Sequence, residues 1–301
     1  MELNILAEFC GDNKTDYRSG EPMSTHTSFK IGGPADIFIT PDSEDKLSEV
    51  IKKCSELKIP YFILGKGSNV LVSDRGIEGA VISMSRMNEI TVNGDKITCL
   101  AGAALSEVCR TALNSSLSGL EFAYGIPGSV GGALYMNAGA YGGEMSDIAE
   151  SACYVTENGE QGCISAGDMA LGYRTSVFKN GGMIITSVTL CLHKGEKSEI
   201  EEKMNDYISR RREKQPLEYP SAGSTFKRPK GYFAGALIEK NGLKGYKSGG
   251  AMVSEKHAGF VINCGNASAM DVKNVIDKVK KTVLEADGVA LEPEVILVGD
   301  F

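Results

Sequence analysis

The chain has 301 residues, a formal net charge of -7, 42% hydrophobic residues and 24% charged residues. This composition is too apolar for a disordered protein, and the length exceeds what one hydrophobic core usually supports, so we expect two or three compact units. Lysine and arginine are interspersed with aspartate and glutamate, which argues against a nucleic-acid partner.

The N-terminal segment and the cysteines indicate the compartment. Residues 1–22 contain no basic segment followed by a long apolar stretch, and no window reaches the length of a membrane-spanning helix. We therefore expect a cytoplasmic protein that does not insert into membranes. The eight cysteines include no CxxC pair, and no histidine lies at metal-ligand spacing, so we expect buried thiols and no metal site.

The first part of the chain predicts a small α/β unit, followed by a hairpin and a helix. Asp42 or Ser43 can cap a helix that Pro60 stops, and Asn93-Gly94 supplies the positive φ angles of a tight hairpin. Apolar residues at helical spacing predict a second helix over residues 105–113. Short strands are predicted at residues 36–40, 61–64, 70–74, 80–85, 89–92 and 96–101.

The composition changes toward the C-terminus, and we place a domain boundary near residue 195. The charged segment 194–216 predicts a helix that contains the basic cluster Arg210–Lys214. This cluster is either a solvated helix end or a feature that attracts a phosphorylated ligand. Further strands are predicted at residues 153–160, 183–192, 259–263 and 294–299, and further helices at residues 233–241 and 272–283.

Two glycine-rich segments are candidates for anion binding, because glycine lets backbone N–H groups approach a ligand without a Cβ. The first follows an apolar strand and is either a phosphate loop or a simple tight turn; it is neither a Walker loop nor GxGxxG. The second combines proline with four glycines, which favours a polyanionic cofactor over a tightly packed corner. The first segment is Gly65, Lys66, Gly67, Ser68 and Asn69, and the second contains Gly125, Pro127, Gly128, Ser129, Gly131, Gly132 and Ala133.

Three polar residues in apolar or glycine-rich surroundings are candidate site residues. Arg174 has aromatic and apolar neighbours, so it is either a surface residue or a partly buried guanidinium that needs an anion. Ser224 lies on either an ordinary turn or a bend that displays a hydroxyl, and no GxSxG elbow surrounds it. Glu294 starts an apolar strand, where it either faces solvent or is an acid with a perturbed pKa.

Together these segments resemble one family, the UDP-N-acetylenolpyruvoylglucosamine reductases. The resemblance covers nearly the whole chain in a specific order and spacing. Its motifs are THTSFKIGGPAD (25–36), ILGKGSNVLVSD (63–74), GIPGSVGGALYMNAGAYGGE (125–144), GYRTSVFK (172–179), SAGSTFKRP (221–229), GYKSGGAMVSEKHAGFVIN (245–263) and LEPEVILVG (291–299).

The resemblance implies an α+β fold, with a vanillyl-alcohol-oxidase (PCMH)-type FAD-binding region of two subdomains and an α+β C-terminal domain. We expect the FAD-binding region at residues 1–195, with a subdomain boundary near 85–95, and the substrate-binding domain at residues 196–301. The resemblance also implies that the two glycine-rich segments hold the FAD pyrophosphate, mainly through backbone amides.

The activity that the resemblance implies is reduction of UDP-N-acetylglucosamine enolpyruvate to UDP-N-acetylmuramate, a step of peptidoglycan precursor synthesis. In the family, NADPH reduces FAD, hydride passes to C3 of the enolpyruvyl group, and negative charge builds on C2 and the carboxylate. Arg174 and Glu294 would then polarise the carboxylate, and Ser224 would protonate C2.

The chain resembles the short type of the family, because few residues separate GYRTSVFK from the next strand and the tyrosine-bearing loop of the longer type is absent. The UDP portion then needs other partners, for which Lys227, Arg228, Lys256 and His257 are the candidates. Two alternatives stay open: a flavoenzyme that oxidises small hydroxy acids, and a flavin- or nucleotide-binding protein without catalysis.

Overall fold

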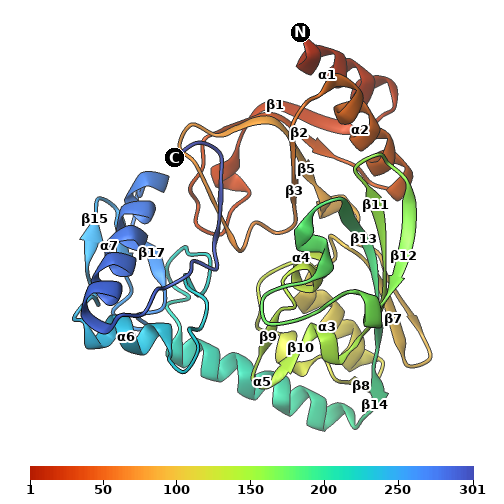
Figure 1. Ribbon diagram of the computed structural model, residues 1–301. Helices are drawn as coiled ribbons and strands as arrows, with labels where there is room; N and C mark the ends of the chain where they lie inside the picture. The colour runs from red at the N-terminus through yellow and green to blue at the C-terminus, as the bar shows by residue number, and fades with distance from the viewer. The chain divides into compact units, whose positions relative to one another are not determined.

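The computed structural model describes residues 1–301 and every side chain except that of Asn180. The chain divides into two compact units, each assembled from segments that are distant in sequence (Figure 1). The last crossing between the units lies after Arg211, whereas the composition places the domain boundary near residue 195. Unit 1 is Met1–Ser19, Ile37–Lys66 and Gly79–Arg211, and unit 2 is Gly20–Asp36, Gly67–Glu78 and Arg212–Phe301.

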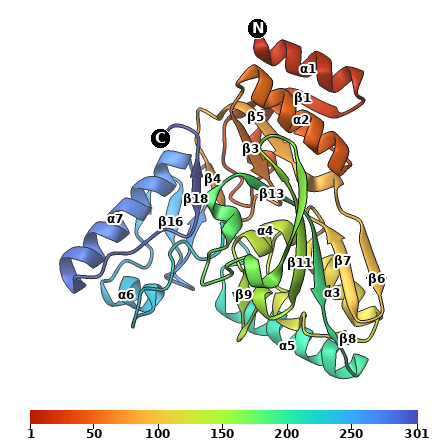
Figure 2. The same cartoon turned by 45° about the vertical axis from the view of Figure 1, so that its right-hand side comes forward.

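Unit 1 contains a four-stranded sheet of order β1-β2-β5-β3 and a five-stranded sheet of order β12-β11-β13-β7-β6. In the second sheet β11 and β13 run side by side and antiparallel (Figure 2). The strands of the first sheet are β1 (Asp16–Pro22), β2 (Pro34–Thr40), β3 (Tyr61–Leu64) and β5 (Ile77–Ser83). Those of the second are β6 (Ile90–Asn93), β7 (Lys96–Leu100), β11 (Ala149–Thr156), β12 (Gln161–Ser165) and β13 (Met183–Cys191).

Helices and short strand pairs complete unit 1, although β1, β2, β5 and α5 continue across the unit boundary. The helices are α1 (Glu2–Asp12), α2 (Glu44–Leu57), α3 (Leu105–Asn114), α4 (Val130–Tyr135) and α5 (Lys197–Lys214). Strand β8 (Leu117–Ser118) pairs with β14 (His193–Lys194), and β9 (Gly139–Ala140) pairs with β10 (Gly143–Glu144). Short 3-10 turns are η2 (Met84–Arg86), η3 (Glu121–Ala123), η4 (Met145–Asp147), η5 (Ala166–Asp168) and η6 (Val177–Asn180). The buried faces of these elements form one hydrophobic core.

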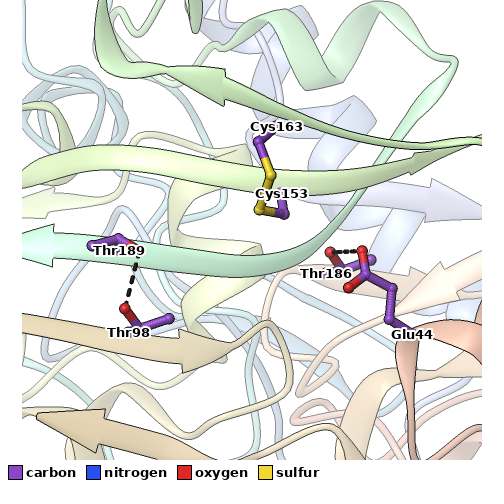
Figure 3. Close-up of a disulfide and its surroundings, with 6 residues drawn as sticks. All are labelled: Glu44, Thr98, Cys153, Cys163, Thr186 and Thr189. Atoms are coloured by element: carbon purple, nitrogen blue, oxygen red, sulfur yellow. Dashed lines mark hydrogen bonds between the residues drawn. A yellow bond between two sulfur atoms is a disulfide. The ribbon is translucent and has the colours of Figure 1, made fainter.

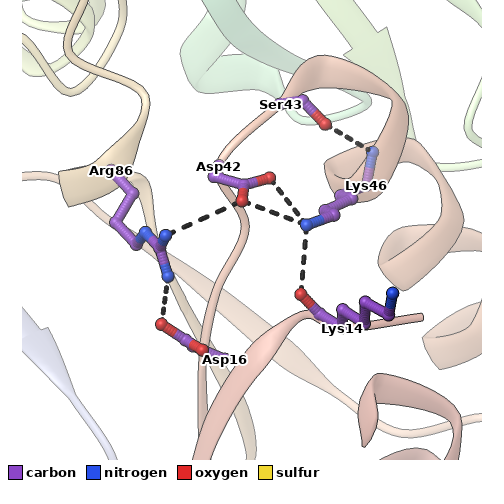
Figure 4. A network of polar contacts seen from close by, with 6 residues as sticks. All are labelled: Lys14, Asp16, Asp42, Ser43, Lys46 and Arg86. Atoms are coloured by element: carbon purple, nitrogen blue, oxygen red, sulfur yellow. Dashed lines mark hydrogen bonds and ion pairs between the residues drawn. The ribbon is translucent and has the colours of Figure 1, made fainter. Parts of the chain in front are cut away.

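The N-terminus of α2 shows which of two sequence candidates caps this helix. The side chain of Ser43 accepts a hydrogen bond from Lys46 N–H at 3.3 Å, so Ser43 is the cap. Asp42 instead forms ion pairs with Lys46 and Arg86, and Arg86 also pairs with Asp16 (Figure 4). Because these side chains are exposed, the network contributes little to stability and forms no candidate site.

Unit 2 is an α+β unit around its own hydrophobic core. Helix α7 packs along the three-stranded sheet β15-β16-β17 (Figure 1), and its predicted apolar face, Val272 to Val283, is buried there. A separate parallel pair joins β4 to β18. The elements are η1 (Met23–Thr25), β4 (Val70–Val72), α6 (Ala234–Lys240), β15 (Lys247–Ser248), β16 (Ala251–Val253), β17 (Val261–Asn263), α7 (Ala269–Asp287) and β18 (Ile296–Val298). In the described residues 1–301, no helix combines the length and apolarity needed to cross a bilayer.

The hairpin between β6 and β7 forms as predicted, but its turn differs. Asn93 pairs with Lys96, so the two-residue loop is Gly94-Asp95 and Asn93 is the last residue of β6. Only Gly94 has a positive φ, at +64°. The expectation that both residues of the Asn93-Gly94 pair take positive φ is therefore wrong.

The cysteine prediction is confirmed for four of the eight residues and wrong for the other four, because two form a disulfide and Cys191 and Cys264 are exposed. Cys10, Cys54, Cys99 and Cys109 are at most 1% exposed, and burial raises the pKa of each thiol, to about 11 for Cys10. Cys153 and Cys163, by contrast, form a disulfide between β11 and β12 (Figure 3). They lie directly opposite each other in the antiparallel register. Sequence spacing could not show this pairing, because it depends on which strands are neighbours.

Candidate functional site

The two glycine-rich segments meet inside unit 1. Gly65 follows β3, and a Cβ built on it would lie 2.5 Å from Ser129 Oγ in the second segment. A Cβ on Gly131 would lie 2.7 Å from the Ala101 Cβ. Gly131 therefore has no room for a side chain, whereas at Gly65 only the end of the Ser129 side chain is that close. The structure thus brings together Gly65 and the Gly125–Ala133 segment, which the sequence singled out separately.

The second segment contains the start of a helix, α4, which the sequence did not predict. Ser129 is the N-cap, and its side chain accepts from Gly132 N–H at 3.4 Å. Gly131, Gly132 and Ala133 therefore lie in the first turn of a helix. Glycine-rich composition hid this helix, since glycine lowers helix propensity.

This part of unit 1 fits a polyanionic group. Within the described residues, the backbone N–H groups of Gly128 and Ser129 donate to no other backbone group, whereas Val130 and Gly131 donate to Ala103 and Ala101. Amides at a helix N-terminus beside glycines form a concave surface that accepts phosphate oxygens. The arrangement supplies hydrogen-bond donors and no bulky side chain.

Gly67, Ser68 and Asn69 of the first segment belong to unit 2, whereas Lys66 lies in unit 1. Gly67 has a φ of +62°, and a Cβ there would lie 2.0 Å from the carbonyl oxygen of His26, so this position also requires glycine. Its carbonyl accepts from Ser28 N–H at 3.0 Å. Asn69 Nδ2 donates to the Glu294 carbonyl at 3.1 Å. Sequence distance concealed this link between the GKGSN turn and Glu294.

Arg174 lies in unit 1 at the tip of a two-residue turn between Gly172 and Thr175. Its φ is +54°, in the left-handed region that residues with side chains rarely adopt. Its Nη2 donates to the Gly139 carbonyl at 3.5 Å, and the guanidinium carbon lies 5.3 Å from the centre of the Tyr173 ring. The side chain is half-buried, which favours the second of the two interpretations of this residue.

Ser224 and Glu294 lie on neighbouring segments of unit 2. Glu294 N–H donates to the carbonyl of Thr225, the residue after Ser224, at 2.8 Å. Ser224 is exposed, and Gly223 before it has a φ of +74°, which favours the bend, one of the two interpretations of this segment. Glu294 is half-buried just before β18. The Ser224 hydroxyl and the Glu294 carboxyl are therefore carried by two backbone segments that are hydrogen-bonded to each other.

The four candidate partners for a UDP group all lie in unit 2 but differ in availability. Lys227 forms an ion pair with the exposed Glu292 at 3.0 Å. The guanidinium carbon of Arg228 lies 3.9 Å from the centre of the Phe233 ring. Lys256 donates to the Arg212 carbonyl at 2.8 Å. His257 accepts a backbone N–H at Nδ1, and burial lowers its pKa, so it is neutral near pH 7.

Comparisons with known proteins identify the family of this chain. Residues 35–162 match the family described as FAD binding domain, and residues 215–298 match the C-terminal domain of UDP-N-acetylenolpyruvoylglucosamine reductase. The chain is 52% identical over 300 residues to the UDP-N-acetylenolpyruvoylglucosamine reductase of Clostridium novyi, covering 100% of this chain and 97% of that protein. The chain belongs to the UDP-N-acetylenolpyruvoylglucosamine reductase family.

Other members of the family and a more distant fold relative extend this result. The reductase of Caldanaerobacter subterraneus subsp. tengcongensis is 51% identical over 280 residues, 93% of each chain. The crystal structure of UDP-N-acetylenolpyruvylglucosamine reductase from Thermus caldophilus matches with a TM-score of 0.81 and 35% identity, covering 95% of this chain and 99% of that one. A berberine bridge enzyme variant, 15% identical with a TM-score of 0.50 over 64% of this chain and 44% of its own, shares the fold alone. The fold is thus α+β, with a vanillyl-alcohol-oxidase-type FAD-binding region and a C-terminal domain.

Proposed function

We infer that this chain is an FAD-dependent reductase that uses NADPH to convert UDP-N-acetylglucosamine enolpyruvate to UDP-N-acetylmuramate in peptidoglycan precursor synthesis. The observation that carries this function is the 52% identity to a UDP-N-acetylenolpyruvoylglucosamine reductase along the whole chain. The reaction takes place in the cytoplasm, where the nucleotide substrate and NADPH are available.

The glycine-rich segments hold the FAD. The close approach of Gly65 to Ser129, and the donors of Gly128 and Ser129, support a site for its pyrophosphate. Bound FAD supplies a two-electron carrier between NADPH and the enolpyruvyl group. The full set proposed to bind the cofactor is Gly65, Lys66, Gly67, Ser68, Asn69, Gly125, Pro127, Gly128, Ser129, Gly131, Gly132 and Ala133.

Three residues act on the enolpyruvyl group. The planar guanidinium of Arg174 binds the substrate carboxylate and stabilises the negative charge that builds there. Glu294 assists by hydrogen bonding to the same carboxylate, for which it has to be protonated. Ser224 protonates C2, and its exposed position on a glycine bend supports this role.

Residues 1–195 are proposed as the FAD-binding region, with two subdomains that meet near residues 85–95, and residues 196–301 as the substrate-binding domain. Lys227, Arg228 and Lys256 are proposed to contact the UDP portion through their positive charge. His257 contributes a hydrogen bond and not a charge, because its pKa is lowered by burial.

Turnover tests the function against its two alternatives. Purified protein with bound flavin should oxidise NADPH rapidly when the enolpyruvyl nucleotide is added, and should not oxidise lactate. Flavin colour without NADPH oxidation would favour a flavin-binding protein without catalysis. Rapid oxidation of lactate-like acids would favour the hydroxy-acid flavoenzyme.

A further inference from the structure

The turn that carries Arg174 has a backbone conformation that needs support from its surroundings. Gly172 and Thr175 close it with two reciprocal hydrogen bonds of 3.1 Å, and Arg174 at its tip has φ +54°. The left-handed conformation is unfavourable for a residue with a side chain. Such a conformation persists only where neighbouring contacts fix it.

Asn137 makes the most deeply buried of these contacts. Its side chain is 0% exposed, and Nδ2 donates to the Gly172 carbonyl at 3.1 Å. Its Oδ1 accepts from Ser146 N–H at 2.9 Å. One buried amide therefore joins the Arg174 turn to the segment that follows β10, using a donor on one side and an acceptor on the other.

The β9–β10 hairpin next to Asn137 also receives the guanidinium. Arg174 Nη2 donates to the carbonyl of Gly139, which pairs with Glu144 across this hairpin. Two further hydrogen bonds restrain the turn. Lys179 Nζ donates to the Arg174 carbonyl at 3.1 Å, and Ser176 Oγ donates to the Tyr135 carbonyl at 2.7 Å. The guanidinium of Arg174 thus contacts the β9–β10 hairpin directly, and the turn that carries Arg174 contacts residues 137–146 through Asn137.

We propose that Asn137 is a positioning residue for Arg174. Its amide holds the Gly172–Thr175 turn at residues 137–146 and thereby fixes the guanidinium where it binds the substrate carboxylate. Asparagine suits the position because it tolerates the φ of +43° found there and offers both a donor and an acceptor. The proposal rests on the proposed function, since it assumes that Arg174 binds that carboxylate.

Asn137→Asp removes the Nδ2 donor, keeps the side-chain shape and the acceptor for Ser146, and adds a carboxyl group that Asn137→Gly does not add. NADPH should reduce the flavin of the variant at the wild-type rate. Reoxidation by the enolpyruvyl nucleotide should slow about 10- to 100-fold, because misplacing a catalytic group by ~1 Å costs about 10²-fold. An unchanged reoxidation rate in a folded, flavin-loaded variant would overturn the proposal.

A double-mutant cycle separates positioning from general destabilisation. If Asn137 acts through Arg174, then Asn137→Asp should slow reoxidation far less in an Arg174→Lys background than in the wild type. Additive losses would contradict the proposal. Asn137→Gly removes the whole amide, tolerates positive φ and should show the same non-additivity, so it replaces Asn137→Asp if the latter does not fold.

Ser48→Ala is a matched control for the loss of a buried hydrogen bond in unit 1. Ser48 Oγ donates to the Gly159 carbonyl at 2.6 Å, and the residue is 5% exposed. This variant should lower Tm and leave the reoxidation rate unchanged, whereas an equal slowing would also overturn the proposal. If the wild type does not reduce the enolpyruvyl nucleotide, the proposed function fails as well; if it does and Asn137→Asp matches it, only the positioning role fails.

Discussion

The two units present their candidate site residues in different ways. In unit 1 the Gly65 and Gly131 positions lie close to Ser129 and Ala101, and the proposed binding groups are backbone amides. In unit 2 Ser224 and Glu294 contribute side chains, placed by hydrogen bonds between the segments that carry them. In the proposed assignments, cofactor binding depends on small residues that leave space for the ligand, and proton transfer depends on the side chains that are present. Adding atoms at the glycines should therefore lower cofactor binding, and removing atoms from Ser224 should slow proton transfer.

The largest expected effect is in unit 2, where Ser224→Ala removes the proposed proton donor. Reoxidation of the reduced flavin by the enolpyruvyl nucleotide should slow by about 10²–10⁴-fold, the usual contribution of general acid catalysis. Reduction by NADPH should be unaffected. Stopped-flow traces in which both half-reactions match the wild type would remove Ser224 from the mechanism.

In unit 1, Arg174→Lys is the exception that tests a side chain. Lysine keeps the charge but loses the planar two-point contact with a carboxylate, so kcat/KM should fall by about 10²–10³-fold. Arg86→Lys is the control, because Arg86 serves only the exposed ion pairs with Asp16 and Asp42 (Figure 4). Near-normal turnover of Arg174→Lys would reject the assignment.

The disulfide concerns stability and not chemistry. It closes a loop with a sequence separation of 10 residues, so the double variant Cys153→Ser, Cys163→Ser should lose about 3 kcal/mol of unfolding free energy by the chain-entropy model. Denaturant unfolding measures this loss, and Cys191→Ser, at an exposed free thiol, is the control. Unfolded, unreduced protein should titrate with six thiols. Eight titrating thiols would show that the bond is absent.

Gly131→Ala tests the requirement for absent side chains. The added methyl would lie 2.7 Å from the Ala101 Cβ, so the variant should lose about 1–3 kcal/mol of stability and retain less FAD after purification. Gly167→Ala is the control, because a Cβ there meets no heavy atom within 4 Å. Equal flavin content in the two variants would weaken the account of unit 1.

The smallest expected effect is at the N-terminus of α7 in unit 2. The Ser268 backbone N–H holds the pKa of Asp271 below its ordinary value of 3.8. Because the folded pKa is lowered, this stabilisation is complete above the ordinary value and is lost as the pH falls through the folded pKa. Asp271→Asn should cost about 0.3–1 kcal/mol near pH 7. The difference from wild type should vanish in acid; a constant difference across pH would exclude this origin.

The sequence predicted the features that local patterns determine. The apolar face from Val272 to Val283 follows from spacing within a few residues and is present. Spacing also indicated Ser43 as one of two cap candidates and a bend as one of two interpretations of Ser224, and the structure selects these. Family resemblance supplied the roles of the site residues, which stay predictions.

What the sequence could not show depends on strand register and on contacts between distant segments. The Cys153–Cys163 bond requires the β11–β12 register, and the role proposed for Asn137 requires Gly172 to lie beside it. Helix α4 was missed for a local reason, since the glycines that allow close approach to Ala101 also weaken the helical signal. An asparagine within a glycine-rich segment is a sequence signal for a side chain that joins two backbone segments, as Asn137 does.

An anaerobic single turnover tests whether the chain reduces the enolpyruvyl nucleotide and whether Ser224 takes part in that step. Flavin is bleached with one equivalent of NADPH and then mixed with the enolpyruvyl nucleotide, in the wild type and in Ser224→Ala. In the wild type, flavin colour should return rapidly with formation of the lactyl ether. In the variant, bleaching should be equally rapid but the colour should return slowly. A wild-type flavin that stays bleached in the presence of the nucleotide would contradict it.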